Sequence, residues 1–316
     1  MLEDRYLNSN QLCFFIHDVM VEFIKGGEEN KIFISEFKLS EQEKESLNNF
    51  EGHILDWLKS NNKTKEYEIT IKKRVIPALL SDMLHCIYET LKAMELGKVT
   101  IAYMLLRKPI QENLYLFEEM ILREDSFIKV FEENPLLLRP KNAGDIEGHK
   151  NRIKIILETL KLDSILDSSY LATLRYDKKS EDSFDGVCNQ AMHLFTQHQA
   201  IKTENLNINF IFADKESKKT LYDFMYSRLP YLMYYIYLVF EQIVGSISAT
   251  TQDYLADIHH RISAMFLLSY AQIDDHYKTQ QFYDLCILFE KYLIKSFKCE
   301  LSLNTLESIA FTGKAL

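Results

Sequence analysis

Apolar residues recur along most of the chain at spacings of three, four and seven positions, which places them on one face of an α-helix. After Lys218, for example, Leu221, Met225, Leu232 and Ile236 form a single stripe. The same pattern occurs in the segments 76–91, 110–121, 153–160, 221–243, 255–273 and 282–293. Such stripes are typical of amphipathic or buried helices that pack together in a bundle.

Signals for β-strands are limited to three short stretches, residues 31–37, 67–72 and 207–210. The first is extended in character, and the other two alternate apolar with polar side chains, as a half-buried strand does. We expect these stretches to be connectors or, at most, to form one short β hairpin. The sequence therefore predicts an all-α fold, a multi-helix bundle of roughly eight to eleven helices.

Local signals mark where helices begin or change direction. Ser40 followed by Glu43 is a capping box, and it predicts the start of a helix that runs towards Trp57. Pro109 and Pro230 fall inside helical patterns. Because proline removes a backbone hydrogen bond, both positions predict a kink or a break.

The least periodic stretches are residues 59–66, 134–149 and 177–184. We place a domain boundary near residue 64, which divides the chain into an N-terminal helical cap, residues 1–64, and a main helical bundle, residues 65–316. The stretch 134–149 contains Pro135, Pro140 and two glycines, a composition that predicts a flexible loop.

The composition narrows the functional classes. The 316 residues include only 9 Gly, and neither GxGxxG nor GxxxxGK followed by Ser or Thr occurs, so the two standard phosphate-binding loops are absent. The net charge is −9, and the basic residues are dispersed among more numerous acidic ones. Because binding to nucleic acids and anionic membranes relies on a basic surface, we expect no non-specific nucleic-acid binding and no membrane association.

The five cysteines form no CxxC motif and no close pair, which predicts buried thiols in a reducing compartment. The apolar run at residues 229–240 is shorter than the about 20 residues that a membrane span needs. The first residues show no basic region followed by an apolar run, so no secretory signal is visible. We therefore expect a cytoplasmic protein.

Arg107 and Glu112 are the first candidates for chemistry. Arg107 lies one turn before Ile110 on an apolar stripe, so its guanidinium begins on the core side of the helix. A charge there must be paired or must line a cavity. Two interpretations stay open, a structural ion pair with partners on other helices and a functional site. Glu112 lies about 140° away around an ideal helix, so we expect no direct pair between the two residues.

A second candidate is a polar stripe on a helix expected at residues 182–196. Its members recur every four residues and are Asp185, Asn189, His193 and Gln197. A histidine beside amide side chains is suited to general acid–base catalysis or to reading a ligand. We therefore assign His193 a catalytic role and the other three a ligand-binding role, with a solvated helix face as the alternative.

A third candidate is a metal site near Asp257, His259 and His260. Asp257 and His260 are three residues apart, the spacing at which helix bundles present a carboxylate and a histidine to a di-metal centre. Such centres need a second pair of this kind, and the sequence contains no second Glu-x-x-His. We therefore assign no metal ligand, and a metal near these residues stays an open alternative.

Part of this pattern resembles helical bacterial proteins of the HEPN type (higher eukaryotes and prokaryotes nucleotide-binding), which often act in phage defence or as toxins. In these proteins a long helix carries an arginine followed five residues later by a glutamate, and a later segment carries a tyrosine and a histidine. The matching residues here, within 75–200, are Arg107, Glu112, either Tyr170 or Tyr176, and His193.

The chain departs from HEPN ribonucleases at one position. Those enzymes share an arginine followed, after four to six residues, by a histidine, and this chain has no such pair. Glu112 stands in the place of the histidine. A carboxylate replaces an imidazole near neutral pH only when its pKa is strongly raised.

Two functional hypotheses follow. The first is a non-catalytic module that binds a protein or small-molecule partner in a bacterial defence or regulatory system. The second is a nuclease or nucleotide-processing enzyme that uses Arg107, Glu112 and His193, with or without a metal. The 20 Phe and 18 Tyr also predict a homodimer formed through an aromatic patch. No residue pattern identifies a cofactor.

Overall fold

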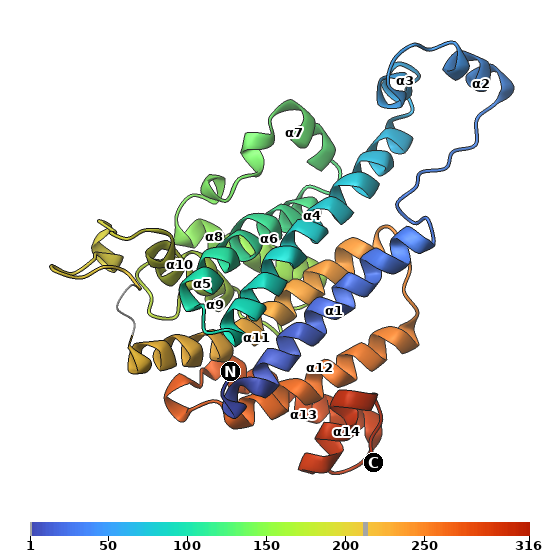
Figure 1. Ribbon diagram of the computed structural model, residues 1–316. Coiled ribbons are helices and arrows are strands. Elements are labelled where there is room, and N and C mark those ends of the chain that lie inside the picture. The colour runs from blue at the N-terminus through green and yellow to red at the C-terminus, as the bar shows by residue number, and fades with distance from the viewer. Residues whose placement is uncertain (1, 211–213) are drawn as a thin grey trace.

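The computed structural model describes residues 2–210 and 214–316, which form an all-α protein (Figure 1). The long helices are α1 (Leu7–Glu29), α4 (Thr64–Glu95), α8 (Ile146–Leu160), α11 (Lys215–Gly245), α12 (Gln252–Gln272) and α13 (Gln280–Phe297). The shorter ones are α2 (Glu41–Asn48), α3 (Ile54–Ser60), α5 (Val99–Lys108), α6 (Leu114–Leu122), α7 (Phe127–Glu133), α9 (Ser168–Tyr176), α10 (Phe184–Met192) and α14 (Leu303–Thr312). The described residues contain no β-strand, so the predicted all-α fold is confirmed.

The helices outnumber the roughly eight to eleven that we expected, because short segments such as α2 and α3 carry too few apolar positions to show a periodic pattern. The stretch 67–72, which alternates like a strand, lies within α4. Tyr67 and Ile71 pack against the core, whereas Ile69 is exposed. Positions four apart face the same way on a helix, so this short alternating stretch is equally compatible with helical packing.

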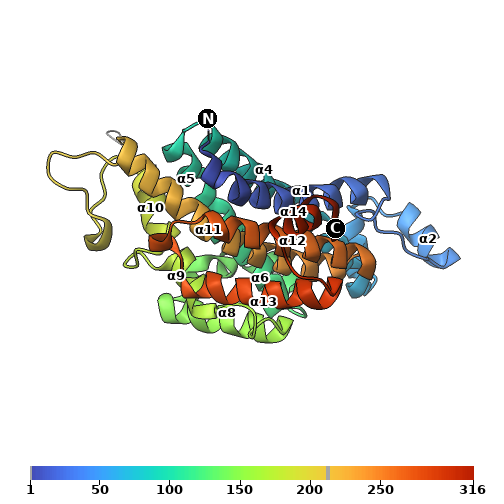
Figure 2. The same cartoon turned by 90° about the horizontal axis from the view of Figure 1, so that it is seen from below.

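Helix α11 is the centre of the molecule. Every residue from 223 to 240 is buried, and Figures 1 and 2 show the helix passing through the body between α1 and α6, both of which contact it. The helix continues past Pro230 without a break. Its long apolar run is explained by burial on all sides. None of the helices in the described ranges combines the length and the apolar character that crossing a membrane requires.

The residues expected to form an N-terminal cap are divided between two places. Helix α1 belongs to the main core, because it packs against α4, α11 and α12 and because Leu12, Cys13 and Ile16 are fully buried. Helices α2 and α3 project from the body at the beginning of α4 (Figure 1). The boundary expected near residue 64 lies at the start of α4. Only the projecting α2–α3 arm is separate from the bundle, because α1 also precedes residue 64 but belongs to the main core.

The capping box at the start of this arm is confirmed. The Ser40 hydroxyl accepts a hydrogen bond from the Glu43 backbone N–H, and the Glu43 carboxylate accepts one from the Ser40 backbone N–H. The helix that begins there ends at Asn48 and does not reach Trp57, which lies on α3 and is buried. Trp57 donates its indole N–H to the Ser46 hydroxyl at 3.1 Å and so ties the two short helices together.

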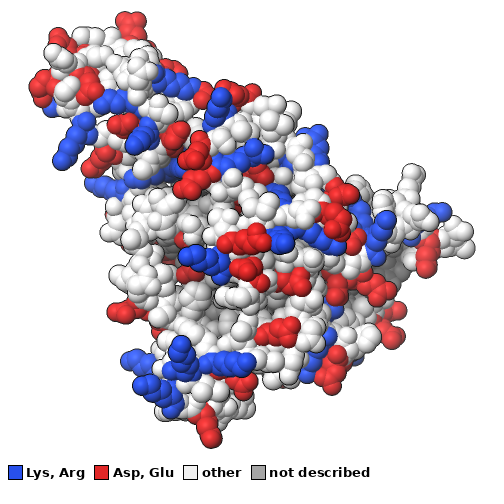
Figure 3. Space-filling view, turned by 180° about the vertical axis from the view of Figure 1, so that it is seen from behind, with Lys and Arg blue, Asp and Glu red and all other residues white. Residues whose placement is uncertain are grey.

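Acidic and basic side chains are interspersed over the face of the molecule that Figure 3 shows. Most of the surface ion pairs on the described residues join neighbouring turns of one helix, as Lys25 with Glu22 and Lys150 with Glu147 do. Pairs of this kind contribute only about 0.3–0.5 kcal/mol each. The surface charges therefore do little for stability, and the charges that matter lie inside the bundle.

Candidate functional site

A π-helical turn joins α5 to α6 and makes one continuous helix of the two. It covers Pro109–Asn113, and the backbone N–H of Leu114 bonds to the Pro109 carbonyl five residues earlier. Proline at this position removes a backbone donor, which favours such a local rearrangement. Because a π turn closes over five residues, it moves Arg107 and Glu112 closer to one face than an ideal α-helix does. π turns are frequent at functional sites.

Arg107 and Glu112 line the same pocket, which has a volume of about 330 Å³ and which we call the Arg107 pocket. The helices α5, α8, α9 and α10 that surround it lie together on one side of the molecule (Figure 1). The stretch 134–149, expected to be a loop, forms two short 3₁₀ turns, Pro135–Leu138 and Pro140–Ala143, before α8 begins. Its second turn walls the pocket, and the charged lining residues are Arg107, Glu112, Arg139, Lys141, Asp145, Lys178 and Asp185.

Three of the four cations that line the pocket have no carboxylate partner among the residues that the structure describes. Within the described part of the chain, no ion pair involves Arg107, Arg139 or Lys141. The Arg107 guanidinium donates from Nη1 to Met192 Sδ at 3.5 Å, and its buried Nε has no hydrogen-bond partner among the described residues. Only Lys178 is paired, with Asp185 at 3.4 Å. Across the lining, four cations face three carboxylates, Glu112, Asp145 and Asp185, and this small excess of positive charge in one concave site favours an anion.

Asp185 is held in a fixed orientation by its neighbours. Its Oδ1 accepts hydrogen bonds from Gln111 Nε2 and Asn189 Nδ2, both at 2.8 Å. Asn189 also donates to the Asp185 carbonyl at 2.7 Å, and Gln111 donates to the Arg175 carbonyl at 2.6 Å. Asp185, one of the residues expected to bind a ligand, thus lines the pocket, whereas Asn189 does not line it and contacts Asp185 from behind.

His149 completes the wall of the pocket. Its ring stacks on Tyr176, with the centroids 3.7 Å apart and the planes 16° from parallel, and the side chain is buried. Its Nδ1 has no hydrogen-bond partner among the described residues. Burial, reinforced by the guanidinium groups of Arg175 and Arg152, lowers the pKa of His149 to about 4. The imidazole is therefore neutral at pH 7.

A buried ion cluster lies beneath this wall, and we call it the Glu118 cluster. Glu118 is fully buried, and its Oε1 accepts hydrogen bonds from Arg175 Nη1 at 2.5 Å and from the Tyr235 hydroxyl at 2.7 Å. Its Oε2 accepts from Arg152, which also pairs with Glu119 at 3.0 Å. Two guanidiniums on one carboxylate make this a strong, charge-assisted network.

Arg175 connects the Glu118 cluster to the Arg107 pocket. Its Nε donates to the Ile110 carbonyl in the π-helical turn at 2.7 Å, and its Nη2 donates to the Tyr176 hydroxyl at 2.7 Å. The fully buried side chain therefore fixes both the backbone that presents Gln111 and the ring on which His149 stacks. A rigid support of this kind preorganises a binding site.

His193 and Gln197 lie outside the Arg107 pocket. Helix α10 ends at Met192, so the predicted helix 182–196 stops four residues early, and His193 has extended backbone angles of φ −126° and ψ 130°. Asn209 donates its side-chain amide to the His193 carbonyl at 2.7 Å and so holds the chain in a loop. Both side chains are exposed, and neither lines the pocket. Arg107 and Glu112 are thus brought together without His193.

The two tyrosines of the HEPN-like pattern are in different places. Tyr176 lines the Arg107 pocket, while Tyr170 packs against Tyr231 with the ring centroids 5.3 Å apart and does not line it. The residues 75–200 thus bring together Arg107, Glu112 and Tyr176 of that pattern.

The residues considered for a metal do not converge. His259 Nε2 lies 3.2 Å from a carboxylate oxygen of Glu241, and His260 packs against the rings of Tyr292 and Phe297. Over the ranges that the structure describes, no three His, Cys, Asp or Glu side chains are arranged to hold a metal ion.

Sequence analysis missed His149 and the cations Arg139, Lys141 and Lys178. One signal for His149 was present, because it lies three residues after Ile146 and four before Ile153, on the buried face of α8. A histidine on an apolar stripe is a candidate for a perturbed pKa, and such residues are frequent at functional sites. The three cations come from connecting segments whose course the sequence does not specify.

Comparisons with known proteins found nothing similar: no family model matches the chain, and neither a curated protein nor a solved structure resembles it at a significant level. The function must therefore be inferred from the geometry alone.

Proposed function

We propose that the protein is a ligand-binding module and that the Arg107 pocket takes a small anionic molecule that carries a phosphate group. The observation that carries this proposal is that three cations around one pocket of about 330 Å³, Arg107, Arg139 and Lys141, have no carboxylate partner in the described parts of the chain. Like charges that share a cavity repel one another, and a bound anion removes that cost. The neutral ring of His149 forms part of the pocket wall.

The rest of the pocket supports a phosphate ester of modest size. The volume lies near the lower end of the range for small-molecule sites. Glu112 and Asp145 on the lining act against a long polyanion such as nucleic acid. A mononucleotide is small enough for this volume and carries less negative charge than a nucleic acid. A module that binds a mononucleotide suits a role in bacterial defence or regulation.

The first test is a calorimetric titration of the whole chain with adenosine monophosphate, inorganic phosphate and adenosine at low ionic strength. We expect both anions to bind and the neutral nucleoside to bind at least tenfold more weakly than the nucleotide. Arg107→Gln removes a charge-assisted contact worth about 1.5–3 kcal/mol, so the affinity for adenosine monophosphate should fall roughly 10–100-fold.

The matched control is Lys154→Gln, which removes an exposed cation of α8 that does not line the pocket. It should leave the affinity unchanged. The proposal would be refuted if the Arg107→Gln variant bound adenosine monophosphate as tightly as the wild type does. It would also be refuted if the wild type bound neither anion at millimolar concentration.

A second candidate is hydrolysis of the bound nucleotide or of a short RNA. It is favoured by one observation, the presence of the neutral imidazole of His149 and the carboxylate of Glu112 beside Arg107 in one pocket. The chemistry then rests on Arg107, Glu112 and His149, in place of the trio with His193. General acid–base groups contribute typically about 10²–10⁴ in rate.

If the protein is such an enzyme, Glu112→Gln should lower the rate of product formation about 100-fold. Anion-exchange chromatography of the reaction mixture measures that rate. His193→Gln is the matched control and should retain full activity, because its side chain lies outside the pocket. A wild-type protein that releases no product from either substrate leaves the binding module as the function.

A further inference from the structure

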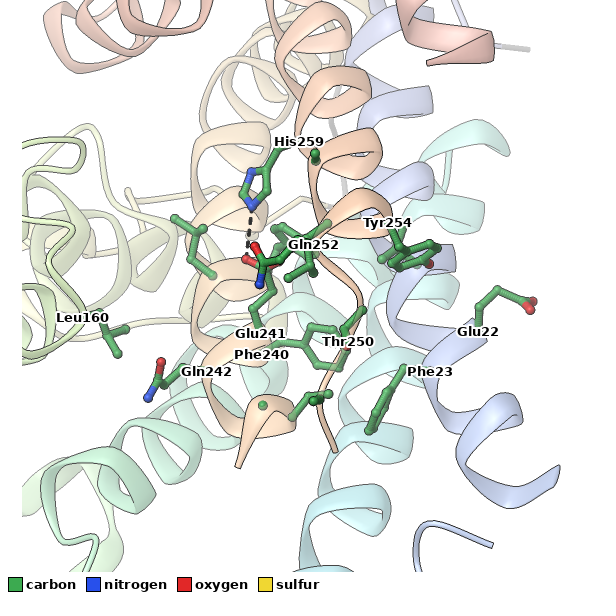
Figure 4. A pocket seen from close by; sticks show the side chains of 18 of the residues that line it. Glu22, Phe23, Leu160, Phe240, Glu241, Gln242, Thr250, Gln252, Tyr254 and His259 are labelled. Atoms are coloured by element: carbon green, nitrogen blue, oxygen red, sulfur yellow. Dashed lines mark hydrogen bonds and ion pairs between the residues drawn. The ribbon is translucent and has the colours of Figure 1, made fainter. Parts of the chain in front are cut away.

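A second pocket lies where α11 meets α12, with α1 on its far side, and we call it the Glu241 pocket (Figure 4). It has a volume of about 800 Å³ and shares no lining residue with the Arg107 pocket. Figure 4 shows His259 of α12 pointing towards Glu241 of α11, and Gln252 lines the same pocket. The two pockets are therefore separate sites with separate chemistry.

The charge of the Glu241 pocket is opposite to that of the Arg107 pocket. Glu241 accepts a hydrogen bond from the Tyr237 hydroxyl at 2.7 Å, and its other oxygen lies 3.2 Å from His259 Nε2. Among the described residues, no lysine or arginine lines the pocket or pairs with Glu241. The other carboxylate on the lining, Glu22, points away from the centre in Figure 4 and is paired with Lys25 at 2.9 Å.

The Glu241 carboxylate therefore lies in a half-enclosed site, and the residues that the structure describes place no lysine or arginine beside it. Its side chain is only 20% exposed, so water screens it incompletely. Burial, with the nearby Glu241 carboxylate, raises the pKa of Tyr237, which keeps the phenol protonated as a donor to Glu241. That hydrogen bond holds the Glu241 carboxylate in place, and its oxygens can still accept from a cationic group.

Aromatic rings make up much of the remaining wall. Phe23 of α1, Phe240 of α11 and Tyr254 of α12 line the pocket together with Tyr237. The faces of aromatic rings attract ammonium groups, and they also bury apolar surface. The rings of Phe23 and Phe240 offer no hydrogen-bond donor to a phosphate or a carboxylate.

We propose that the Glu241 pocket binds an organic amine, whose ammonium group lies against the Glu241 carboxylate and whose apolar or aromatic body packs against the surrounding rings. The volume suits a small organic molecule. A metal cation is a poorer occupant, since the described lining residues supply no cluster of metal ligands. An anion is excluded by the charge of Glu241.

The test uses three probes with one ring system and different charge: tryptamine, a cation at pH 7, tryptophol, which is neutral, and indole-3-acetate, an anion. Binding to the full chain is followed by ligand-observed NMR and by calorimetry. We expect tryptamine to bind at least tenfold more tightly than tryptophol and the anion not to bind. Wild-type protein that prefers the neutral probe, or that binds none of the three at millimolar concentration, overturns the proposal.

The decisive variant is Glu241→Gln, which keeps the shape and the hydrogen bond from Tyr237 but removes the charge. It should bind tryptamine and tryptophol with affinities within about threefold of each other. Asp253→Asn is the matched control, because it removes an exposed carboxylate of α12 that does not line the pocket, and it should retain the wild-type preference. If the Glu241→Gln variant still prefers tryptamine over tryptophol as strongly as the wild type does, the assignment of Glu241 is overturned. Circular dichroism checks that each variant is folded, and the wild-type charge preference tests the site without any variant.

Discussion

Glu118→Ala should lower the free energy of unfolding by about 3–5 kcal/mol, the largest change that we expect from any single substitution in this chain. The carboxylate is fully buried and accepts hydrogen bonds from Arg175, Arg152 and Tyr235. Without it, the fully buried Arg175 guanidinium keeps its charge and loses its counter-charge. Removing one partner of a buried pair costs more than the pair contributes, because the other charge stays desolvated.

Urea unfolding followed by circular dichroism measures this loss as a shift of the midpoint at constant slope. The control is Glu112→Ala, which removes an exposed carboxylate six residues earlier on the same continuous helix and should change stability by less than about 0.5 kcal/mol. A Glu118→Ala variant as stable as the control would show that the cluster is not a unit. Replacing Glu118 and Arg175 together by Leu and Met should recover part of the loss, since neither charge then remains unpaired.

The same cluster gives the fold a dependence on acid. Burial alone opposes ionisation of Glu118, but Arg175 and Arg152 outweigh it and hold the pKa at about 2, below the ordinary value of 4.5. Between these two values the unfolded chain binds more protons than the folded protein does. The stabilisation is therefore complete above pH 4.5 and is lost as the pH falls through 2.

The fold class was predictable because the apolar stripes are long. Helix α11 shows its stripe over six turns, and its complete burial agrees with the apolar run from 229 to 240. The place of α1 was not predictable in the same way. Its residues show that they need burial, but not that α4, α11 and α12 supply it, because the pattern along one helix carries no information about its partners.

The site was predictable only in part, for two physical reasons. Arg107 was identifiable as a cation on the core side of a helix, but its convergence with Glu112 depends on the π turn at Pro109, which changes the angular spacing. Glu118 and Arg175 are 57 positions apart in sequence, so their pairing is a tertiary contact that no local spacing reveals. His193 was expected on a helix but lies beyond the end of α10. A hydrogen bond from Asn209 holds its backbone in a loop, and the local helical pattern gives no sign of that contact.

The second large effect that we expect is a loss of stability between pH 6.5 and pH 4 that depends on His149. The pKa of this histidine is about 4 in the folded protein and 6.5 in a model peptide, so the unfolded chain binds the extra proton throughout that window. Stability then rises with pH across the window and falls as the solution is acidified. Because the side chain is only 5% exposed, the full effect amounts to about 3 kcal/mol.

His149→Phe tests this directly. Phenylalanine keeps a ring stacked on Tyr176 but cannot take up a proton, so the stability of the variant should change much less between pH 6.5 and pH 4 than that of the wild type. Urea midpoints measured at half-unit steps of pH provide the comparison. His276→Gln replaces an exposed histidine between α12 and α13, and it serves as the control for the general effect of removing a histidine on the pH profile.

The two acid-sensitive groups are separable because their windows differ. Protonation of His149 acts above pH 4, and protonation of Glu118 acts below 4.5, so the His149→Phe profile should lose the upper part of the acid-induced decline and retain the lower part. The two groups share Arg175 and Arg152 as neighbours, which is why one electrostatic cluster both stabilises the core and keeps the wall of the Arg107 pocket neutral. A wild-type profile that is flat from pH 6.5 to pH 4, or a variant with an unchanged slope in that window, would contradict the placement of His149 beside these two guanidinium groups.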